Sequence, residues 1–184
     1  MKRRYFRLVH LYPTEIEQEA RKALAGYPEL NDTHIEFKWG KIARQSFMLA
    51  QPIIPTLLKH RSKRGYQIIM KRHFFMDNPK FPNGRVLSNV IVGWLAHELG
   101  HVLDYKDRSS INLMWFGVMY YFSHDFLRKA DISADKNAVE RGFIDSIVES
   151  KRFDRNPKYF PQSYINKLNT LYPSVFQVME WAEQ

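Results

Sequence analysis

The sequence predicts an α+β fold, in which a small N-terminal twisted sheet is followed by a helical half. Residues 34–39 alternate between apolar and polar side chains, which is typical of a strand with one buried face. Residues 66–74 are rich in β-branched and aromatic side chains, which predicts a second strand. From about Ser88 onward the apolar residues recur at helical spacing. Because strands come early and helices late, the pattern favours α+β over an alternating α/β fold.

The early half contains a predicted helix and two less regular segments. Thr14 and Glu17 have the spacing of a capping box, which predicts a helix that starts there and is closed by Gly26. The segment 41–58 fits neither helix nor strand clearly, because prolines interrupt it. Residues 77–84 contain two prolines and an Asn-Gly pair, which indicate a turn region.

The helical half starts at Ser88, which we expect to cap a helix that reaches about Tyr105. Further helices are predicted at 111–122, 126–141 and 143–150, followed by two short helices, the last starting near Pro173. The segment 111–122 is the most apolar stretch, yet it is far shorter than the roughly 20 residues that a membrane-spanning helix needs. We therefore expect this helix to be buried in the protein rather than to touch a membrane.

The composition limits the classes of protein and site. Hydrophobic residues make up 45% of the chain and charged residues 26%, which indicates a globular chain with a substantial core. The chain has no cysteine, so it can form neither a disulfide nor a thiolate metal site. The 184 residues suit one domain over residues 1–184, with an α/β part at about 1–85 and a helical part at about 86–184.

The chain is basic, with a formal net charge of +9 at pH 7. Basic residues gather at positions 2–4, 59–64 and 71–72. A solvated surface is the simplest interpretation, and attraction to nucleic acid, an anionic membrane or an acidic partner is the alternative. The N-terminus has a basic tip without the apolar stretch of a signal peptide. We expect a cytoplasmic protein without a transmembrane segment, with peripheral membrane attachment as the alternative.

Residues 97–101 read His-Glu-Leu-Gly-His, which is the HExxH pattern. Residues four apart on a helix lie on the same side, so His97 and His101 can bind one metal ion. Imidazole nitrogens bind Zn²⁺ at about 2.0–2.1 Å. Glu98 points too far sideways to be a ligand but can reach a water beside the metal. The pattern therefore predicts a Zn²⁺ site with Glu98 as the catalytic carboxylate.

Two glycines, Gly93 and Gly100, lie inside the predicted metal-site helix. Each lowers helix stability by about 1 kcal/mol relative to alanine. We expect this loss to be offset by close packing against a strand or a neighbouring helix.

Two stretches of the chain resemble known metallopeptidases. Residues 94–105 resemble the active-site helix of zincin metallopeptidases, and residues 128–142 resemble the second signature of the gluzincin family that includes the CAAX prenyl endopeptidases and the heat-shock membrane peptidases. The resemblance covers roughly residues 85–145 and implies a zincin-like fold. It also implies Asp131 as the third metal ligand. Asp135, at the second acidic position, would accept the free ring N–H of a ligand histidine and fix its tautomer.

Asp131 departs from the family pattern, which has Glu at that position. Asp is shorter by one methylene, so the two helices must approach more closely than in the family. Small residues that would permit this approach occupy the same stretch: Ala130, Ser133, Ala134 and Ala138. Taken without the resemblance, Asp131 and Asp135 are equally well explained as acidic residues of a helix's first turn.

Other residues remain candidates for the third ligand. Asp107 has a metzincin-like spacing, but Asp104 stands where that pattern needs glycine. His124 could serve as a later histidine ligand, and Glu140 is a weaker candidate. Asp104 returns to nearly the same helix face as His97, so it either supports the ligand histidines from behind or is solvated.

The function predicted from these residues is a zinc-dependent peptidase that hydrolyses a peptide or protein substrate. Glu98 is expected to act as general base toward a zinc-activated water and to pass the proton to the leaving amine. Four side chains could stabilise the oxyanion: Tyr105, Tyr120, Tyr121 and His124. We expect an extended substrate to pair with the predicted strand at 66–74.

Members of the resembled family are often embedded in membranes, whereas this sequence predicts no spanning segment. The alternative function is a non-catalytic zincin-fold regulatory or binding protein. Its basic patches would then recruit it to nucleic acid or to an anionic membrane.

Overall fold

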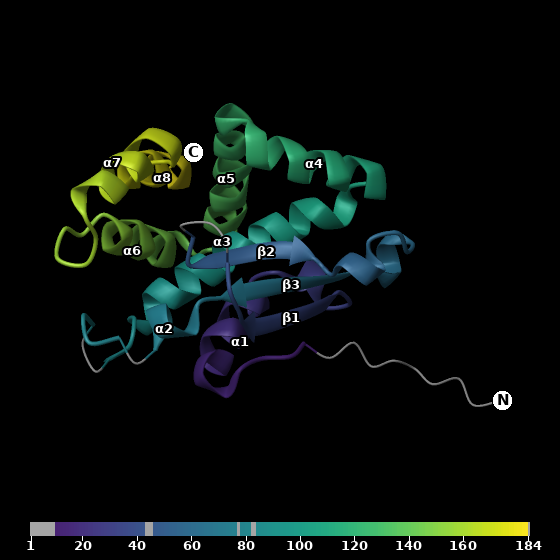
Figure 1. Ribbon diagram of the computed structural model, residues 1–184, viewed down its shortest axis with the longest axis horizontal. Coiled ribbons are helices and arrows are strands. Elements are labelled where there is room, and N and C mark those ends of the chain that lie inside the picture. Colours follow the sequence, from purple (N-terminus) through teal and green to yellow (C-terminus); the bar gives the residue numbers. More distant parts are fainter. Residues whose placement is uncertain (1–9, 43–45, 77, 82–83, 184) are drawn as a thin grey trace.

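The computed structural model describes residues 10–42, 46–76, 78–81 and 84–183. The chain is α+β, and the described residues form one three-stranded sheet with the strand order β1-β3-β2. The strands are β1 (His34–Trp39), β2 (Met48–Pro52) and β3 (Gly65–Met70). β3 runs parallel to β1 and antiparallel to β2. The sheet lies in the lower half of Figure 1, and the later helices gather above it.

The strand predicted at residues 66–74 is confirmed only as far as Met70, and the expectation that a substrate pairs with it is wrong, because it has no free edge. β3 is hydrogen-bonded on both sides, to β1 and to β2. After Met70 the chain turns into the short helix α2 (Arg72–Phe75). Phe74 stacks on Phe47 with ring centroids 3.6 Å apart, and Phe75 is fully buried. The aromatic side chains that suggested a longer strand therefore belong to a helical turn. They pack into the core without extending β3.

The free edge of the sheet beside the helical half is β2, which lies in the segment 41–58 whose type the sequence left open. β2 packs against the long helix α3 (Ser88–Asp107). Pro52, which has no backbone N–H, is the last residue of β2, where a proline interrupts the sheet least.

The helices agree with the sequence pattern in type, although their starts differ in detail. The remaining helices are α1 (Glu17–Ala25), α4 (Ser110–Phe122), α5 (His124–Glu140), α6 (Ile144–Asp154), α7 (Gln162–Leu171) and α8 (Val175–Ala182). Short 3-10 turns occur at Thr14–Ile16, Pro28–Leu30, Ile54–Thr56 and Arg61–Lys63. The predicted capping box does not form, because the Thr14 hydroxyl faces Glu15 and the first turn is a 3-10 helix. Ser88 is the first helical residue rather than the cap, which is Leu87.

α3 is the centre of the molecule. It packs against α1, β2, α5 and α6, and most of its side chains are buried. The close packing expected at its glycines is confirmed. A Cβ on Gly93 would collide with the backbone carbonyl of Ser146 in α6, and one on Gly100 would lie 2.6 Å from the Ala134 carbonyl oxygen in α5. Both neighbouring helices can therefore approach the backbone of α3 directly.

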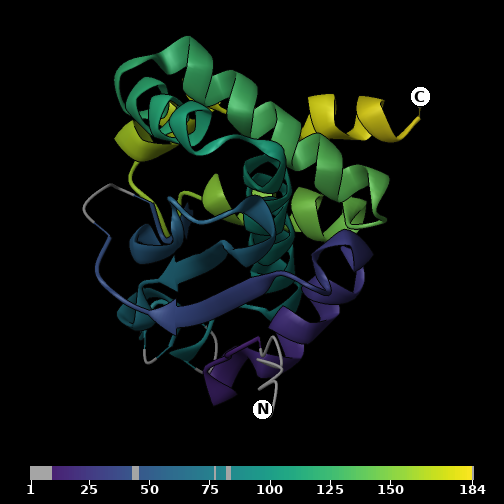
Figure 2. The same ribbon diagram turned by 90° about the vertical axis from the view of Figure 1, so that its right-hand side faces the viewer.

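The expectation that the apolar segment 111–122 is buried is wrong. α4 buries only Leu113 and Phe116 against the rest of the protein. Most of its other large apolar side chains are exposed, because α4 packs mainly against α5 and no described element covers its outer side. Figure 2 shows α4 and α5 together at the top of the molecule, at some distance from the sheet.

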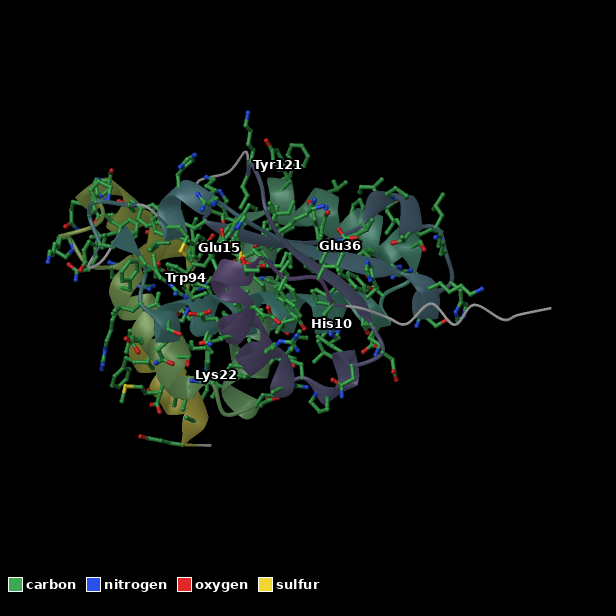
Figure 3. The ribbon with its side chains drawn as sticks, turned by 90° about the horizontal axis from the view of Figure 1, so that it is seen from below. His10, Glu15, Lys22, Glu36, Trp94 and Tyr121 are labelled. Atoms are coloured by element: carbon green, nitrogen blue, oxygen red, sulfur yellow. The ribbon has the colours of Figure 1, made fainter. Side chains whose placement is uncertain are left out.

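The hydrophobic core is continuous from the sheet to the C-terminal helices. The same cluster of buried residues contains Ile16 of the N-terminal turn, Ile68 of β3, Leu99 of α3 and Val178 of α8. α1 closes the underside, where Figure 3 shows it in front of the other elements with Lys22 on its outer surface. Within the described residues, no helix is both long enough and apolar enough to cross a bilayer.

Candidate metal centre

Two histidines and one aspartate converge between α3 and α5. His97 Nε2 lies 3.1 Å from His101 Nε2. Asp131 Oδ1 lies 3.2 Å from His101 Nε2 and 3.5 Å from His97 Nε2. The three atoms thus form a nearly equilateral triangle, contributed by one turn of α3 and one residue of α5.

This triangle has the dimensions of a metal site. Ligand atoms about 2.0–2.1 Å from a tetrahedral ion are separated by about 3.3 Å from one another, which matches the observed edges. Asp131 is almost completely buried, and its second oxygen, Oδ2, has no hydrogen-bond partner within the described residues. A buried carboxylate oxygen without a partner is unfavourable unless a positive charge is nearby. The cluster of His97, His101 and Asp131 can therefore hold a metal ion.

The close approach of α3 and α5 explains how aspartate reaches the histidines. The backbone of Ala134 lies against Gly100, so any side chain at position 100 would push the helices apart. Ala134 and Ala138 are both buried at this interface. The short side chain of Asp131 is therefore long enough here, as the small residues of this stretch indicated.

Asp135, one turn after Asp131, supports His97 from behind. Its Oδ1 accepts a hydrogen bond from His97 Nδ1 at 2.8 Å, which leaves Nε2 directed at the cluster. Its Oδ2 forms a buried ion pair with Lys151 Nζ of α6 at 2.6 Å. Burial opposes ionisation of Asp135, but Lys151 and His97 outweigh it and lower the pKa of the carboxyl group. Asp135 therefore stays ionised and fixes the orientation of the ring.

The electrostatic field of the cluster favours positive charge. Burial alone lowers the pKa of His97, but the carboxylates of Asp135 and Asp131 more than compensate and raise that pKa to about 10. Burial likewise opposes ionisation of Asp131, and the hydrogen bonds from His101 and His97 overcome it and lower its pKa. A cation at this position, whether a proton or a metal ion, is thus stabilised by two buried carboxylates.

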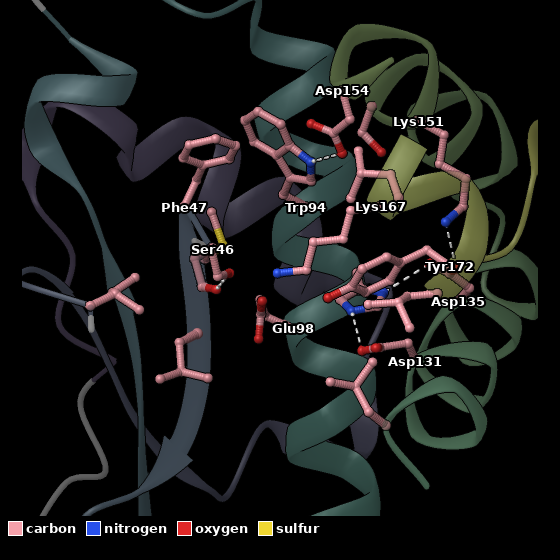
Figure 4. Close-up of a pocket in the computed structure, with 18 of the residues that line it drawn as sticks. Ser46, Phe47, Trp94, Glu98, Asp131, Asp135, Lys151, Asp154, Lys167 and Tyr172 are labelled. Carbon is pink, nitrogen blue, oxygen red and sulfur yellow. Dashed lines mark hydrogen bonds and ion pairs between the residues drawn. The ribbon is translucent and has the colours of Figure 1, made fainter. Parts of the chain in front are cut away.

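Glu98 lies beside the cluster and faces the sheet. The carboxylate is buried, and its Oε2 accepts a hydrogen bond from the backbone N–H of Ala50 at 2.6 Å. That N–H belongs to β2 and points away from β3, so it is a free-edge donor. Figure 4 shows Glu98 in the space between the strand and the helices that carry the cluster. The strand therefore fixes the position of the carboxylate next to the histidines.

The other residues considered from sequence lie elsewhere. Asp104 forms a two-pronged ion pair with Arg108, with Nε–Oδ2 at 2.8 Å and Nη2–Oδ1 at 3.0 Å, so it does not support a ligand histidine as one alternative suggested. Asp107 is the exposed last residue of α3. His124 begins α5 and lines the neighbouring pocket, while Glu140 ends the same helix. Within the described residues, the three-ligand cluster contains Asp131 and none of these side chains.

A cavity of about 420 Å³ opens onto the cluster. The helices and strands that line it are β2, α3, α4, α5, α6 and α7, and Figure 4 shows their side chains surrounding the space beside Glu98. Lys167 reaches into this space from α7, and Tyr172 lies near the cluster. Helices α6 and α7 thus close the pocket opposite the sheet.

The cavity wall contains a further carboxyl group, on Asp154. Trp94 Nε1 donates a hydrogen bond to its Oδ2 at 3.1 Å. Burial raises the pKa of Asp154 to about 6, and the Trp94 hydrogen bond and the charge of Lys151 only partly oppose this shift. Sequence reasoning missed both Asp154 and Lys151, because they lie on a helix that carries no motif and only the fold brings them to α3.

Among the four side chains proposed as oxyanion donors, Tyr120 lies nearest to the cluster. Its hydroxyl donates to Asp131 Oδ1 at 3.1 Å, and burial raises its pKa well above the usual value, so it keeps its proton. Tyr105 is buried with its ring stacked against His101. Tyr121 and His124 line the same cavity.

The chain was compared with protein-family models, with curated proteins and with solved structures, and none of them matches it.

Proposed function

We propose that this protein is a zinc-dependent peptidase of the zincin type. One observation carries the proposal: two histidine nitrogens and a buried carboxylate form a triangle of ligand size, with the Glu98 carboxylate held next to it. A structural metal site needs no such carboxylate beside its ligands. A catalytic site does, because a base must accept the proton of the attacking water.

The donor set supports zinc as the ion. Two imidazoles and one carboxylate are the ligands of many catalytic zinc sites, in which the fourth position stays open to water or substrate. Mg²⁺ and Ca²⁺ prefer sites made of oxygen ligands. Bound at this cluster, zinc would supply a Lewis acid that polarises the scissile carbonyl and lowers the pKa of the attacking water.

Glu98 is the proposed general base. Its carboxylate takes a proton from the water that attacks the carbonyl carbon, and it then delivers that proton to the leaving amine. The Ala50 N–H binds one carboxylate oxygen, so the other oxygen is available for the proton. Because a backbone N–H holds the Glu98 carboxylate, the orientation of that carboxylate does not depend on the rotamer of another side chain.

The free edge of β2 is the proposed docking strand for an extended substrate, in place of the strand at 66–74. β2 borders the cavity, and its N–H at Ala50 already contacts Glu98. A peptide that pairs with this edge would pass directly over the cluster. Tyr120 is the proposed donor to the oxyanion, because it is protonated and contacts a ligand of the cluster. Its O–H, which donates to Asp131 in this structure, would turn to the oxyanion when a substrate is bound.

The substitution Glu98→Gln tests this function. Glutamine keeps an oxygen that can accept from Ala50, so the fold and metal content should persist, while hydrolysis of a peptide library should fall by about 10²–10⁴-fold. Metal content is measured by elemental analysis of the purified protein. Cleavage at the wild-type rate in the variant would disprove the role of Glu98, and an inactive wild type with full zinc would favour the non-catalytic alternative.

The ligand set is tested by metal analysis of three single variants. Asp131→Ala should remove most of the bound zinc, because it deletes one ligand of the triangle. Asp107→Ala and His124→Ala serve as matched controls, since both residues were sequence candidates and lie outside the cluster. Retention of zinc in Asp131→Ala together with its loss in either control would show that the third ligand is assigned wrongly.

A further inference from the structure

The outer face of α4 is an exposed apolar stripe. Six large apolar side chains of this helix are between 45% and 77% exposed: Ile111, Met114, Trp115, Val118, Tyr121 and Phe122. Their spacing of three and four residues places them on one side, opposite the buried Leu113 and Phe116. α4 contains no charged residue, although its outer face meets solvent. An exposed apolar face of this kind marks a surface that binds something.

A basic segment adjoins the N-terminal end of this stripe. The Ser110 hydroxyl, at the start of α4, donates to the Leu57 carbonyl at 2.7 Å. The guanidinium of Arg64 is buried in the same junction, where it donates to the Arg108 carbonyl at 2.9 Å and to the Ser110 hydroxyl at 3.1 Å. These contacts fix the segment 54–64 to α4, as Figure 1 shows at the right-hand end of that helix.

The fixed segment combines apolar and basic side chains at the surface. Leu58 is 82% exposed, and Ile54 is 67% exposed. Lys59, Arg61 and Lys63 follow at once and are all exposed. The chain has no acidic residue between Glu36 and Asp77, so nothing in this segment neutralises them. The apolar stripe therefore ends beside a segment whose own charged side chains are all positive.

We infer that the α4 stripe and the basic segment form a docking surface for an anionic lipid bilayer. The apolar side chains would enter the boundary between headgroups and acyl chains, with Trp115 and Tyr121 at the depth that these residues prefer. Lys59, Arg61 and Lys63 would contact lipid phosphates. Figure 3 shows Tyr121 projecting outward at the margin of the molecule.

The charge distribution favours a bilayer over a second copy of the chain. A second copy of the chain carries the same net charge of +9 and the same basic segment, so it offers no complementary charge to this surface. An anionic surface instead complements the charge while it covers the apolar stripe. The inference does not depend on the proposed peptidase activity, because it uses no residue of the metal cluster.

The proposed docking surface lies next to the cavity. Tyr121 belongs to the stripe and lines the cavity as well, and His124 follows immediately after α4 on the cavity wall. A bilayer bound at α4 would therefore lie beside the cavity opening. Docking would bring the cavity close to segments of other proteins at the membrane surface.

Vesicle flotation of the full chain tests the inference. The probe is vesicles of phosphatidylcholine mixed with phosphatidylglycerol, and the reference is vesicles of phosphatidylcholine alone. The protein should float with the anionic vesicles, and raised salt should weaken this binding because it screens the headgroup attraction. An absence of binding to the anionic vesicles at low salt would overturn the inference.

Substitutions localise the contact. Ile111→Ser with Trp115→Ser should weaken binding by about tenfold or more, since both apolar side chains are removed from the interface. Phe176→Ser, an exposed apolar residue of α8, is the matched control and should bind like the wild type. Replacing Lys59, Arg61 and Lys63 with Gln should weaken vesicle binding to a similar extent. The matched control replaces three exposed basic residues elsewhere with Gln and should bind almost like the wild type: Lys22, Lys80 and Arg152.

Tryptophan fluorescence separates a lipid contact from a protein contact. Vesicles made with brominated acyl chains should quench the fluorescence of the wild type, and Trp115→Phe should keep binding but lose most of this quenching. Circular dichroism of each variant establishes that it is folded. Unchanged flotation of the folded Ile111→Ser, Trp115→Ser variant would overturn the inference. So would a concentration-dependent dimer, seen by sedimentation velocity, that the same substitutions abolish while vesicles never bind.

Discussion

Helices α3 and α4 follow one another in the sequence and are both apolar, yet the fold treats them in opposite ways. α3 is enclosed by β2, α1, α5 and α6, although it carries His97, Glu98 and His101. α4 contains no charged residue, and most of its large side chains face solvent. The more polar helix is thus the buried one.

The difference lies in what surrounds each helix. The buried ionisable side chains of α3 have partners that other elements supply, as Asp131 does for His101 and the Ala50 N–H does for Glu98. These partners make burial of polar groups tolerable. α4 buries Leu113 and Phe116 and turns Tyr120 toward Asp131, while its outer side meets solvent. Whether a helix is buried is therefore decided by the elements that pack against it and not by its own hydrophobicity.

The largest effect that we expect concerns the glycines of α3. Gly93→Ala should destabilise the protein by about 3 kcal/mol, because the new Cβ collides with the Ser146 carbonyl and overpacking of this kind exceeds the gain in helix propensity. The free energy of unfolding is measured by denaturant titration. A variant as stable as the wild type would show that α3 and α6 can separate without loss, which would contradict the tight enclosure of α3.

A smaller effect concerns the carboxyl group that faces Trp94 of α3. The folded-state pKa of Asp154 is raised to about 6, above an unfolded value of about 3.9. The folded state therefore binds this proton more tightly, and the contribution of Asp154 to stability falls as pH rises from about 4 to about 6. Asparagine keeps an oxygen for the Trp94 N–H and cannot ionise.

Asp154→Asn should therefore raise stability relative to the wild type by about 2 kcal/mol at pH 7 and by much less at about pH 4. Denaturant titrations of both proteins at the two pH values measure the difference. The exposed Asp145, on the same helix α6, provides a matched control, since Asp145→Asn should show no such pH dependence. A stability difference that is the same at both pH values would argue against a buried, destabilised charge at Asp154.

The smallest effect that we expect concerns Gly117, the glycine of α4. A Cβ on Gly117 would meet no atom within 4 Å, so Gly117→Ala should gain helix propensity without a collision. We expect stabilisation by about 1 kcal/mol. Thermal unfolding of Gly93→Ala and Gly117→Ala side by side gives the sharpest form of the comparison, because the same substitution should act in opposite directions. A loss of stability at Gly117 would show that α4 is more tightly packed than its exposure indicates.

Local patterns in the sequence were sufficient for the elements and for part of the site. A helix repeats every 3.6 residues, so the HExxH spacing alone places His97 and His101 on one side of α3. The alternation of apolar and polar residues located the strand at 34–39, and the helical period located the later helices. The zinc ion and the peptidase activity remain proposals that these residues support.

Tertiary structure decided what depends on contacts between distant segments. It brought Asp131, rather than Asp107 or His124, to the two histidines. It also placed Lys151 behind Asp135, set Ala50 of β2 against Glu98, and made residues 65–70 the central strand. No local spacing encodes these pairings, because each partner lies on a separate element and meets the other only when the helices and the sheet pack. The exposure of α4 follows from the same cause, since a helix is covered only where another element reaches it.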